Sequence, residues 1–173
     1  MVPPFDHRHI IAGQGTVGLE IAKAWADVDV VLAPIGGGGL ASGVAAAVKR
    51  LLPSAKVIGV EPEGAASMRR ALDNGSPILL EEIDTIADGL APVIAGALTF
   101  EHARDLMDDV VTVSDDDIRK ATAMLVHRHK LLVEYSGAAT TAALLSGRVK
   151  AEGRRIAAVV SGGNLDPSLF GQL

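Results

Sequence analysis

The chain has 173 residues, 49% of them hydrophobic and 21% charged, with a formal net charge of -5 at pH 7. This composition fits one ordinary domain with a sizeable core and excludes a disordered chain. The absence of cysteine excludes disulfides, thiolate catalysis and cysteine-ligated zinc. The lack of cysteine also fits a reducing compartment, so we expect a cytoplasmic protein. The acidic balance predicts no nucleic-acid partner, and no apolar run is long enough to predict a membrane span.

Along the chain, short apolar runs alternate with helical patterns. Thr16 is placed to cap a first helix, in which Trp25 has helical spacing and is expected in the core. The further predicted helices are 40–52, 65–74, 99–107, 114–129 and 137–145, and the predicted strands are 28–33, 56–61, 110–113 and 156–160. This alternation predicts an α/β fold, a mostly parallel twisted sheet with helices on both faces.

Two glycine-rich turns, at 36–39 and 161–164, each follow a predicted strand. Ligands of parallel sheets bind at the carboxyl ends of the strands, where both turns lie. Four glycines leading into a helix present backbone N–H groups and the positive end of the helix dipole, which predicts a phosphate site at 36–39. A Walker loop is excluded because no Gly-Lys-Ser/Thr follows, and a simple flexible turn stays open as the alternative.

Other polar or glycine-containing segments give weaker signals. The run from Gly13 to Gly18 formally matches G-x-G-x-x-G, but no strand end with an acidic residue about twenty positions later completes a dinucleotide site. The three aspartates at 115–117 are simply interpreted as a helix N-terminus, and His127 and His129 as part of a solvated helix face.

Five segments, in this order, resemble the fold-type-II pyridoxal-phosphate enzymes, most closely threonine dehydratases and serine racemases. They are Ile11-Ala12-Gly13-Gln14-Gly15-Thr16, Pro34-Ile35-Gly36-Gly37-Gly38-Gly39-Leu40, Gly59-Val60-Glu61-Pro62, Ala87-Asp88-Gly89 and Ser161-Gly162-Gly163-Asn164. The resemblance covers nearly the whole chain but only the later part of the family's catalytic domain. With the abrupt start at Pro3-Pro4, it leads us to expect that 1–173 is a C-terminal portion of that domain, without a regulatory domain.

The resemblance implies a set of residues that bind pyridoxal 5'-phosphate. The glycine turn and the Leu40 amide would hold the phosphate, Ser161 would face the pyridine nitrogen, the Gly89 backbone would lie near the ring, and Phe5 would lie in a loop beside the cofactor. The implied phosphate ligands are Gly36, Gly37, Gly38, Gly39 and Leu40. A hydroxyl at the ring nitrogen moderates electron withdrawal, which favours elimination or racemisation. From its position alone, Ser161 is equally well interpreted as a helix cap.

A second implied site is a divalent cation held by Glu61 and the Ala65 carbonyl. In the relatives that bind a cation, the third ligand is an acid, whereas this chain has Ser67. Hard cations prefer several anionic oxygens, so the sequence argues against this site more than for it. Glu134 lies in a Glu-x-x-Gly-Ala stretch like that of the family, and either approaches the cofactor or is a helix-end carboxylate.

The family's Schiff-base lysine lies in a Ser-Phe/Tyr-Lys-x-Arg-Gly segment that has no counterpart here, so no catalytic residue is assigned to this chain. The resemblance therefore implies a portion of an L-threonine or L-serine ammonia-lyase that gives a 2-oxoacid and ammonia and is inactive alone. A racemase of the same family, a non-catalytic module for a phosphorylated ligand and a structural subunit stay open. We expect an amino-acid substrate in the complete enzyme, a homo-oligomer, and neither nucleic acid nor membrane as partner.

Overall fold

The computed structural model describes residues 3–172 and contains a four-stranded parallel sheet with the order β3-β2-β1-β4. The strands are β1 (Val30–Pro34), β2 (Lys56–Pro62), β3 (Asp109–Val113) and β4 (Ile156–Ala158). The α-helices are α1 (Arg8–Ala24), α2 (Gly39–Leu51), α3 (Ser67–Asn74), α4 (Ala97–Leu106), α5 (Asp115–His127) and α6 (Tyr135–Leu145). The predicted α/β architecture with a parallel sheet is confirmed.

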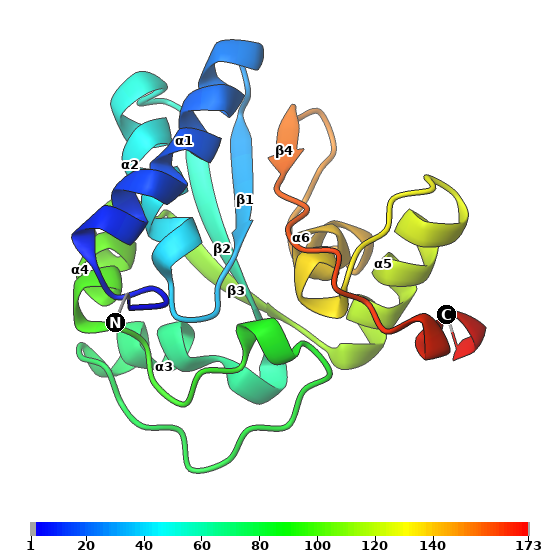
Figure 1. The fold of residues 1–173 in the computed structure, drawn as a ribbon. Coiled ribbons are helices and arrows are strands. Elements are labelled where there is room, and N and C mark those ends of the chain that lie inside the picture. The colour runs from blue at the N-terminus through cyan, green and yellow to red at the C-terminus, as the bar shows by residue number, and fades with distance from the viewer. Residues whose placement is uncertain (1–2, 173) are drawn as a thin grey trace.

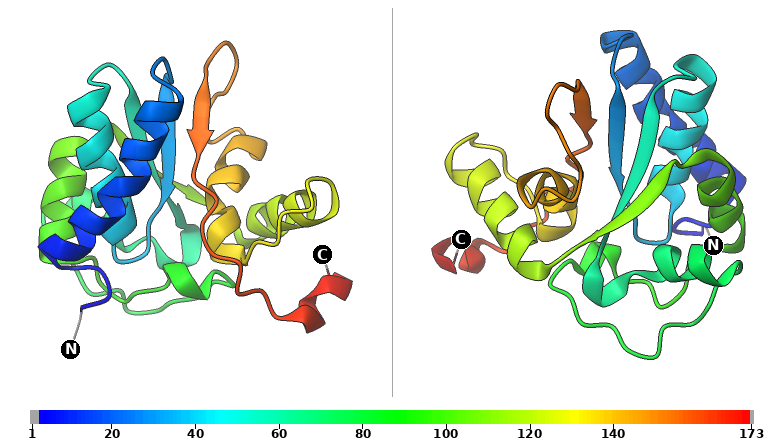
Figure 2. Two further views of the ribbon diagram at one scale, coloured as in Figure 1. Left: turned by 45° about the horizontal axis from the view of Figure 1, so that its top comes forward. Right: turned by 180° about the vertical axis from the view of Figure 1, so that it is seen from behind.

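The sheet separates two hydrophobic cores. Helices α1, α2 and α4 lie on one side, and α5 and α6 on the other (Figure 1), which the view from behind also shows (Figure 2). Successive residues of β1 point to opposite faces, so Val31 belongs to the same core as Val44 and Val48 of α2, whereas Leu32 belongs to the same core as Ala139 of α6. The predicted helices on both faces are thus confirmed, and the carboxyl ends of the strands are left as the edge where ligands bind.

The start of α1 corrects the sequence prediction. The helix begins at Arg8, and His7 is its N-cap, with Nδ1 accepting a hydrogen bond from the His9 N–H at 3.2 Å. Thr16 lies inside the helix, where its hydroxyl donates to the Gly13 carbonyl at 2.7 Å. The cap was misplaced because the glycines between 13 and 18 are poor helix formers by themselves.

Those glycines serve the packing of α1 against α2. A Cβ atom at Gly18 would lie 2.8 Å from the Ala47 Cβ, and one at Gly43 would overlap the α1 backbone at Ile11 and Gly15. Close contact between the two helices therefore requires small residues on both, and it outweighs the low helix propensity of glycine. The G-x-G-x-x-G match is a helix-packing pattern in this fold.

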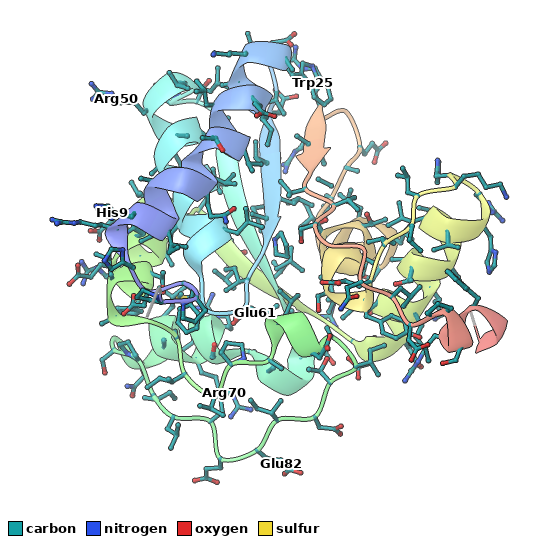
Figure 3. The ribbon with its side chains drawn as sticks, viewed as in Figure 1. His9, Trp25, Arg50, Glu61, Arg70 and Glu82 are labelled. Atoms are coloured by element: carbon teal, nitrogen blue, oxygen red, sulfur yellow. The ribbon has the colours of Figure 1, made fainter. Side chains whose placement is uncertain are left out.

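The prediction that Trp25 belongs to the core is wrong. Trp25 follows the last residue of α1 and is 38% exposed (Figure 3). Its helical spacing was correct, but the helix ends at Ala24, so Trp25 is the C-cap and no longer belongs to the buried face of the helix. In the part of the chain that the structure describes, no helix combines the length and apolar composition needed to span a membrane.

Most other element boundaries are within a few residues of those predicted. Ser114 caps α5 and accepts a hydrogen bond from the Asp117 N–H at 3.2 Å, as predicted. Gly75 ends α3 in the left-handed conformation, with φ +79°. The last strand is shorter than predicted, because β4 pairs with β1 only from Ile156 to Ala158.

Candidate functional site

A cavity of about 290 Å³ lies at the carboxyl edge of the sheet and is lined by every residue predicted to contact the cofactor. These residues are Phe5, Gly36, Gly37, Gly38, Gly39, Leu40, Gly89 and Ser161. They come from four separate stretches of the chain, which the parallel topology brings to one edge. Sequence-distant segments thus converge on one cavity, although their roles in it stay predictions.

The glycine turn connects β1 to α2. Gly38 is the N-cap of α2 and has φ +94°, a conformation that favours glycine, and α2 has neither a side-chain cap nor an acidic residue in its first turn. Within residues 3–172, no atom accepts a hydrogen bond from the N–H groups of residues 36–40. Because Gly38 and Gly39 are buried, these unpaired donors call for an external acceptor, and the helix dipole makes an anion the preferred one.

Phe5 covers this turn from the N-terminal side. A Cβ atom at Gly37 would overlap the Phe5 ring, and one at Gly39 would lie 3.1 Å from the Phe5 Cα. The next residue, Asp6, anchors the segment to α4: its Oδ1 accepts from the N–H groups of Leu98 at 2.9 Å and Thr99 at 3.1 Å. Phe5 is thus held against the glycine turn by a carboxylate that caps another helix.

Gly89 connects the glycine turn to α6. It lies in a short 3-10 helix, Asp88–Leu90, and its N–H donates to the Ser136 hydroxyl at 2.9 Å. A Cβ atom at Gly36 would lie 2.9 Å from the Gly89 carbonyl oxygen, so the two backbones are in close contact. The wall of the cavity between the turn and α6 is therefore built largely from backbone.

Ser161 and Glu134 form the opposite side of the cavity. Gly137, in the first turn of α6, packs directly on the Ser161 carbonyl, leaving no room for a side chain at 137. Glu134 lines the cavity, and its Oε2 accepts from the Asn164 N–H at 2.9 Å. Glu134 is thus a helix-end carboxylate that also lines the cavity, and its approach to the cofactor stays a prediction.

Glu61, predicted as a cation ligand, lies fully buried near the carboxyl end of β2. Its two carboxylate oxygens accept from the backbone N–H groups of Met68 at 2.8 Å and Arg69 at 2.7 Å, at the start of α3. Burial raises the pKa of Glu61 to about 7, and the hydrogen bonds from Met68, Arg69 and Ser67 oppose this shift. Glu61 thus serves as the acceptor for the α3 N-terminus.

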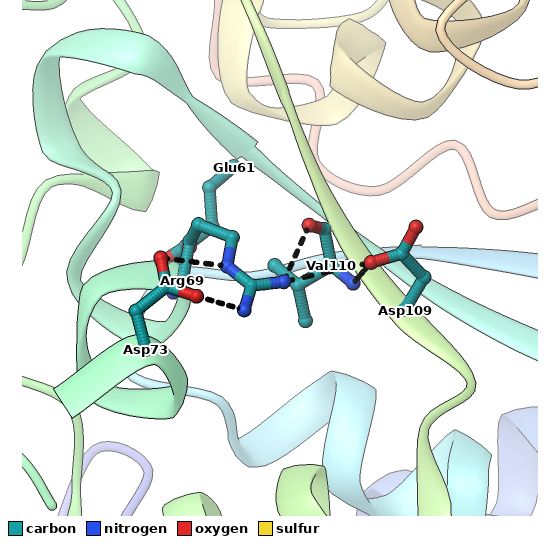
Figure 4. A network of polar contacts seen from close by, with 5 residues as sticks. All are labelled: Glu61, Arg69, Asp73, Asp109 and Val110. Atoms are coloured by element: carbon teal, nitrogen blue, oxygen red, sulfur yellow. Dashed lines mark hydrogen bonds and ion pairs between the residues drawn. The ribbon is translucent and has the colours of Figure 1, made fainter. Parts of the chain in front are cut away.

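Polar contacts of Arg69 fasten the start of α3 to β3 (Figure 4). The Arg69 guanidinium pairs with Asp73 one turn later, and it reaches the Val110 carbonyl and Asp109 Oδ1, both at 3.5 Å. Ala65 is buried in the 3-10 turn Glu63–Ala65 between β2 and α3. Across residues 3–172, no three His, Cys, Asp or Glu side chains form a metal-binding group.

A family model for pyridoxal-phosphate dependent enzymes matches residues 1–162. The chain belongs to this family. Its fold is that of the fold-type-II members, and the resemblance to threonine dehydratases and serine racemases is confirmed.

Three relatives illustrate the likeness. The catabolic L-threonine dehydratase TdcB of Escherichia coli K12 is 42% identical over an alignment that covers 99% of this chain and 53% of TdcB. The processed threonine deaminase isoform 2 of Solanum lycopersicum superposes with a TM-score of 0.91 at 39% identity, over 99% of this chain and 50% of that one. Maize serine racemase gives the same TM-score and identity, over 99% and 53%. The chain spans about half the length of these relatives.

The cavity of this pyridoxal-phosphate family member fits the phosphate end of the cofactor. Any side chain at Gly37 or Gly38 would overlap Phe5 or Thr99, and the unpaired amides of the turn are the donors that a phosphate requires. Among the described residues that line the cavity, none is a lysine. The described lining of the cavity thus offers amides that suit a phosphate, without a lysine amine that would bind the aldehyde covalently.

Sequence reasoning missed three residues that shape the site: Asp6, Thr99 and Ser136. Each acts through one hydrogen bond or a few to backbone far away in the sequence, so no local pattern marks it. Ser136 had the nearest signal, because it lies in the Glu-x-x-Gly-Ala stretch that was singled out for Glu134.

Proposed function

We propose that this chain forms the later part of the catalytic domain of a pyridoxal-phosphate-dependent L-threonine or L-serine ammonia-lyase. The observation that carries the proposal is the glycine turn, whose buried and unpaired amides line a cavity shared with Ser161. The names of relatives such as TdcB and the tomato threonine deaminase support the substrate class.

In this proposal the residues of the chain bind and orient the cofactor. The N–H groups of residues 36–40 and the dipole of α2 hold its phosphate. The Ser161 hydroxyl would hydrogen-bond the pyridine nitrogen, and Gly89 and Phe5 would lie beside the ring. A neutral hydroxyl leaves that nitrogen without a compensating charge, which favours elimination or racemisation over transamination.

When bound, pyridoxal phosphate supplies an electron sink that acidifies the Cα proton of an amino acid. In the proposed reaction L-threonine loses that proton and its β-hydroxyl as water, and hydrolysis then releases ammonia and leaves 2-oxobutyrate. A lysine is the family's base for this proton, and none lines the cavity among the described residues. We therefore predict that the 173-residue chain binds the cofactor but forms no 2-oxobutyrate above a heat-killed control.

A hybrid protein tests the function. This chain replaces the matching residues of TdcB, so that the remainder of TdcB supplies the lysine, and the hybrid is assayed with L-threonine and L-serine. Formation of 2-oxobutyrate from L-threonine supports the dehydratase. A hybrid that folds and binds the cofactor but converts neither amino acid contradicts it.

An amino-acid racemase is the second candidate, because maize serine racemase superposes as well as the tomato threonine deaminase does. The same hybrid separates the two candidates, since a racemase forms D-serine from L-serine and a dehydratase forms pyruvate. The divalent cation at Glu61 and Ala65, the homo-oligomeric state and the cytoplasmic location stay predictions. For the cation, the amide partners of Glu61 give its carboxylate another role in this chain.

A further inference from the structure

The orientation of the glycine turn depends on a threonine outside the cavity. The hydroxyl of Thr99, in the first turn of α4, lies 2.7 Å from the Gly37 carbonyl oxygen and 3.2 Å from that of Gly96. Thr99 is fully buried and does not line the cavity. Its hydroxyl therefore contacts the turn from outside the cavity.

Because the peptide bond is planar, the direction of the Gly37 carbonyl also fixes the direction of the Gly38 N–H. In a trans peptide the carbonyl of one residue and the N–H of the next point in opposite directions, and no cis peptide is present in the described residues. A Gly37 carbonyl directed at Thr99 thus turns the Gly38 N–H away from Thr99. The Gly38 carbonyl in turn accepts from the Ser42 N–H at 2.9 Å inside α2, so the Gly39 N–H points out of the helix start.

Thr99 is itself held in place from the other end. Asp6 Oδ1 accepts from the Thr99 N–H at 3.1 Å, and its Oδ2 accepts from the Ala97 N–H at 3.1 Å. The same segment places the Phe5 ring on Gly37. One network of hydrogen bonds thus fixes the start of α4, the Phe5 loop and the orientation of the glycine turn.

We infer that Thr99 is a positioning residue for the phosphate site: its hydroxyl holds the Gly37 carbonyl and so presents the Gly38 amide to the phosphate, and Asp6 holds Thr99. This inference rests on the proposed function, because it takes the glycine turn as the phosphate cradle. It assigns to α4 a role in ligand affinity, although no residue of α4 touches the cavity.

The test compares three variants with the parent chain. Thr99→Val removes the hydroxyl at nearly constant volume, and Thr99→Ser keeps it. Thr122→Val is the matched control, because Thr122 is an equally buried helical threonine, donating to the Ile118 carbonyl at 2.9 Å, on α5 far from the turn. The readout is phosphate preference, the ratio of the dissociation constants of pyridoxal and pyridoxal phosphate, supported by the rise in unfolding temperature with inorganic phosphate.

We expect Thr99→Val to lower the phosphate preference about tenfold, the worth of one charge-assisted hydrogen bond, with the affinity for pyridoxal unchanged. Thr99→Ser and Thr122→Val keep the parent's preference. If Thr99→Val unfolds at the assay temperature, Asp6→Asn, which weakens the support of Thr99, should lower the preference in the same direction.

Two results overturn the inference in distinguishable ways. If the parent chain shows no phosphate preference, the glycine turn is not a phosphate site, and both the proposed function and the role of Thr99 are contradicted. A parent with a clear preference that Thr99→Val retains, or that Thr99→Ser loses equally, leaves the cradle standing and overturns the role of the Thr99 hydroxyl alone.

Discussion

Two neighbouring strands of the sheet lead into helices at the same edge, and the two helix starts differ in one respect. After β2, the buried Glu61 carboxylate accepts from the first amides of α3. After β1, the glycine turn leaves the amides of residues 36–40 without an acceptor in the described part of the chain. The chain thus supplies a side-chain acceptor for the first amides of α3, whereas the described residues supply none for those of α2.

This difference distinguishes the start of α3, which is capped by the protein itself, from the start of α2, which is the candidate ligand site. The first N–H groups of a helix need hydrogen-bond acceptors. Where they are buried and no protein group accepts from them, they form a cluster of donors that a bound anion can satisfy. Helices α4 and α5 follow the pattern of α3, with Asp6 and Ser114 as the acceptors. The cavity lies beside the start of α2, where the described residues offer the first amides no acceptor.

The largest effect is expected from Gly38→Ala. A Cβ atom there would lie 2.7 Å from the Thr99 Cβ and 3.0 Å from the Met68 Cε, and alanine disfavours the observed positive φ. We expect the affinity for pyridoxal phosphate to fall about 100-fold, the loss of roughly two hydrogen bonds, in a fluorescence titration.

Gly75→Ala is the matched control for that substitution. Gly75 also has a positive φ, +79°, but no heavy atom lies within 4 Å of its added Cβ. It should lose about 1 kcal/mol of stability from the backbone conformation alone and keep the parent's affinity. Equal losses of affinity in the two variants would show that stability, rather than the turn, controls binding.

The contribution of the α3 cap to the free energy of unfolding is expected to depend on pH. Because burial raises the pKa of Glu61 from 4.5 to about 7, the folded chain keeps a proton that the unfolded chain loses in this range. The contribution of Glu61 is therefore most favourable below about pH 4.5 and declines as the pH rises to about 7, by about 3 kcal/mol. Urea unfolding of the parent and of Glu61→Gln between about pH 5 and 8 measures it.

In that comparison, Glu61→Gln replaces the titratable carboxyl with an amide of nearly the same size. The free energy of unfolding of the parent, minus that of the variant, should fall with pH. A difference that stays constant or rises across the range would show that Glu61 is ionised throughout.

A smaller effect is expected at the far side of the cavity. Ser161→Ala should weaken pyridoxal phosphate binding by about fivefold, because it would remove the proposed hydrogen bond to the ring, and it should weaken pyridoxal binding equally. Ser146→Ala, a serine at the end of α6 away from the cavity, is the control. A loss confined to the phosphorylated ligand would place Ser161 at the phosphate end instead.

Local patterns predicted the sheet, the glycine turn and most helices, because strand, cap and turn residues act within a few positions of one another. They failed for α1, whose glycines form a helix only because α2 packs against them, and for Trp25, which lies just beyond the end of that helix. Asp6, Thr99 and Ser136 could not be found from sequence, because their partners are distant in the chain and become neighbours only through the fold.

The central claim is that the glycine turn binds phosphate while the α3 start does not. Backbone amide NMR shifts of the parent chain, followed during titration with pyridoxal phosphate and then with inorganic phosphate, test it most directly. We predict large, saturable shifts for residues 36–40 with both ligands, and none for Met68 and Arg69, whose amides Glu61 occupies. Unshifted glycine amides, or equal shifts at both helix starts, would contradict the account.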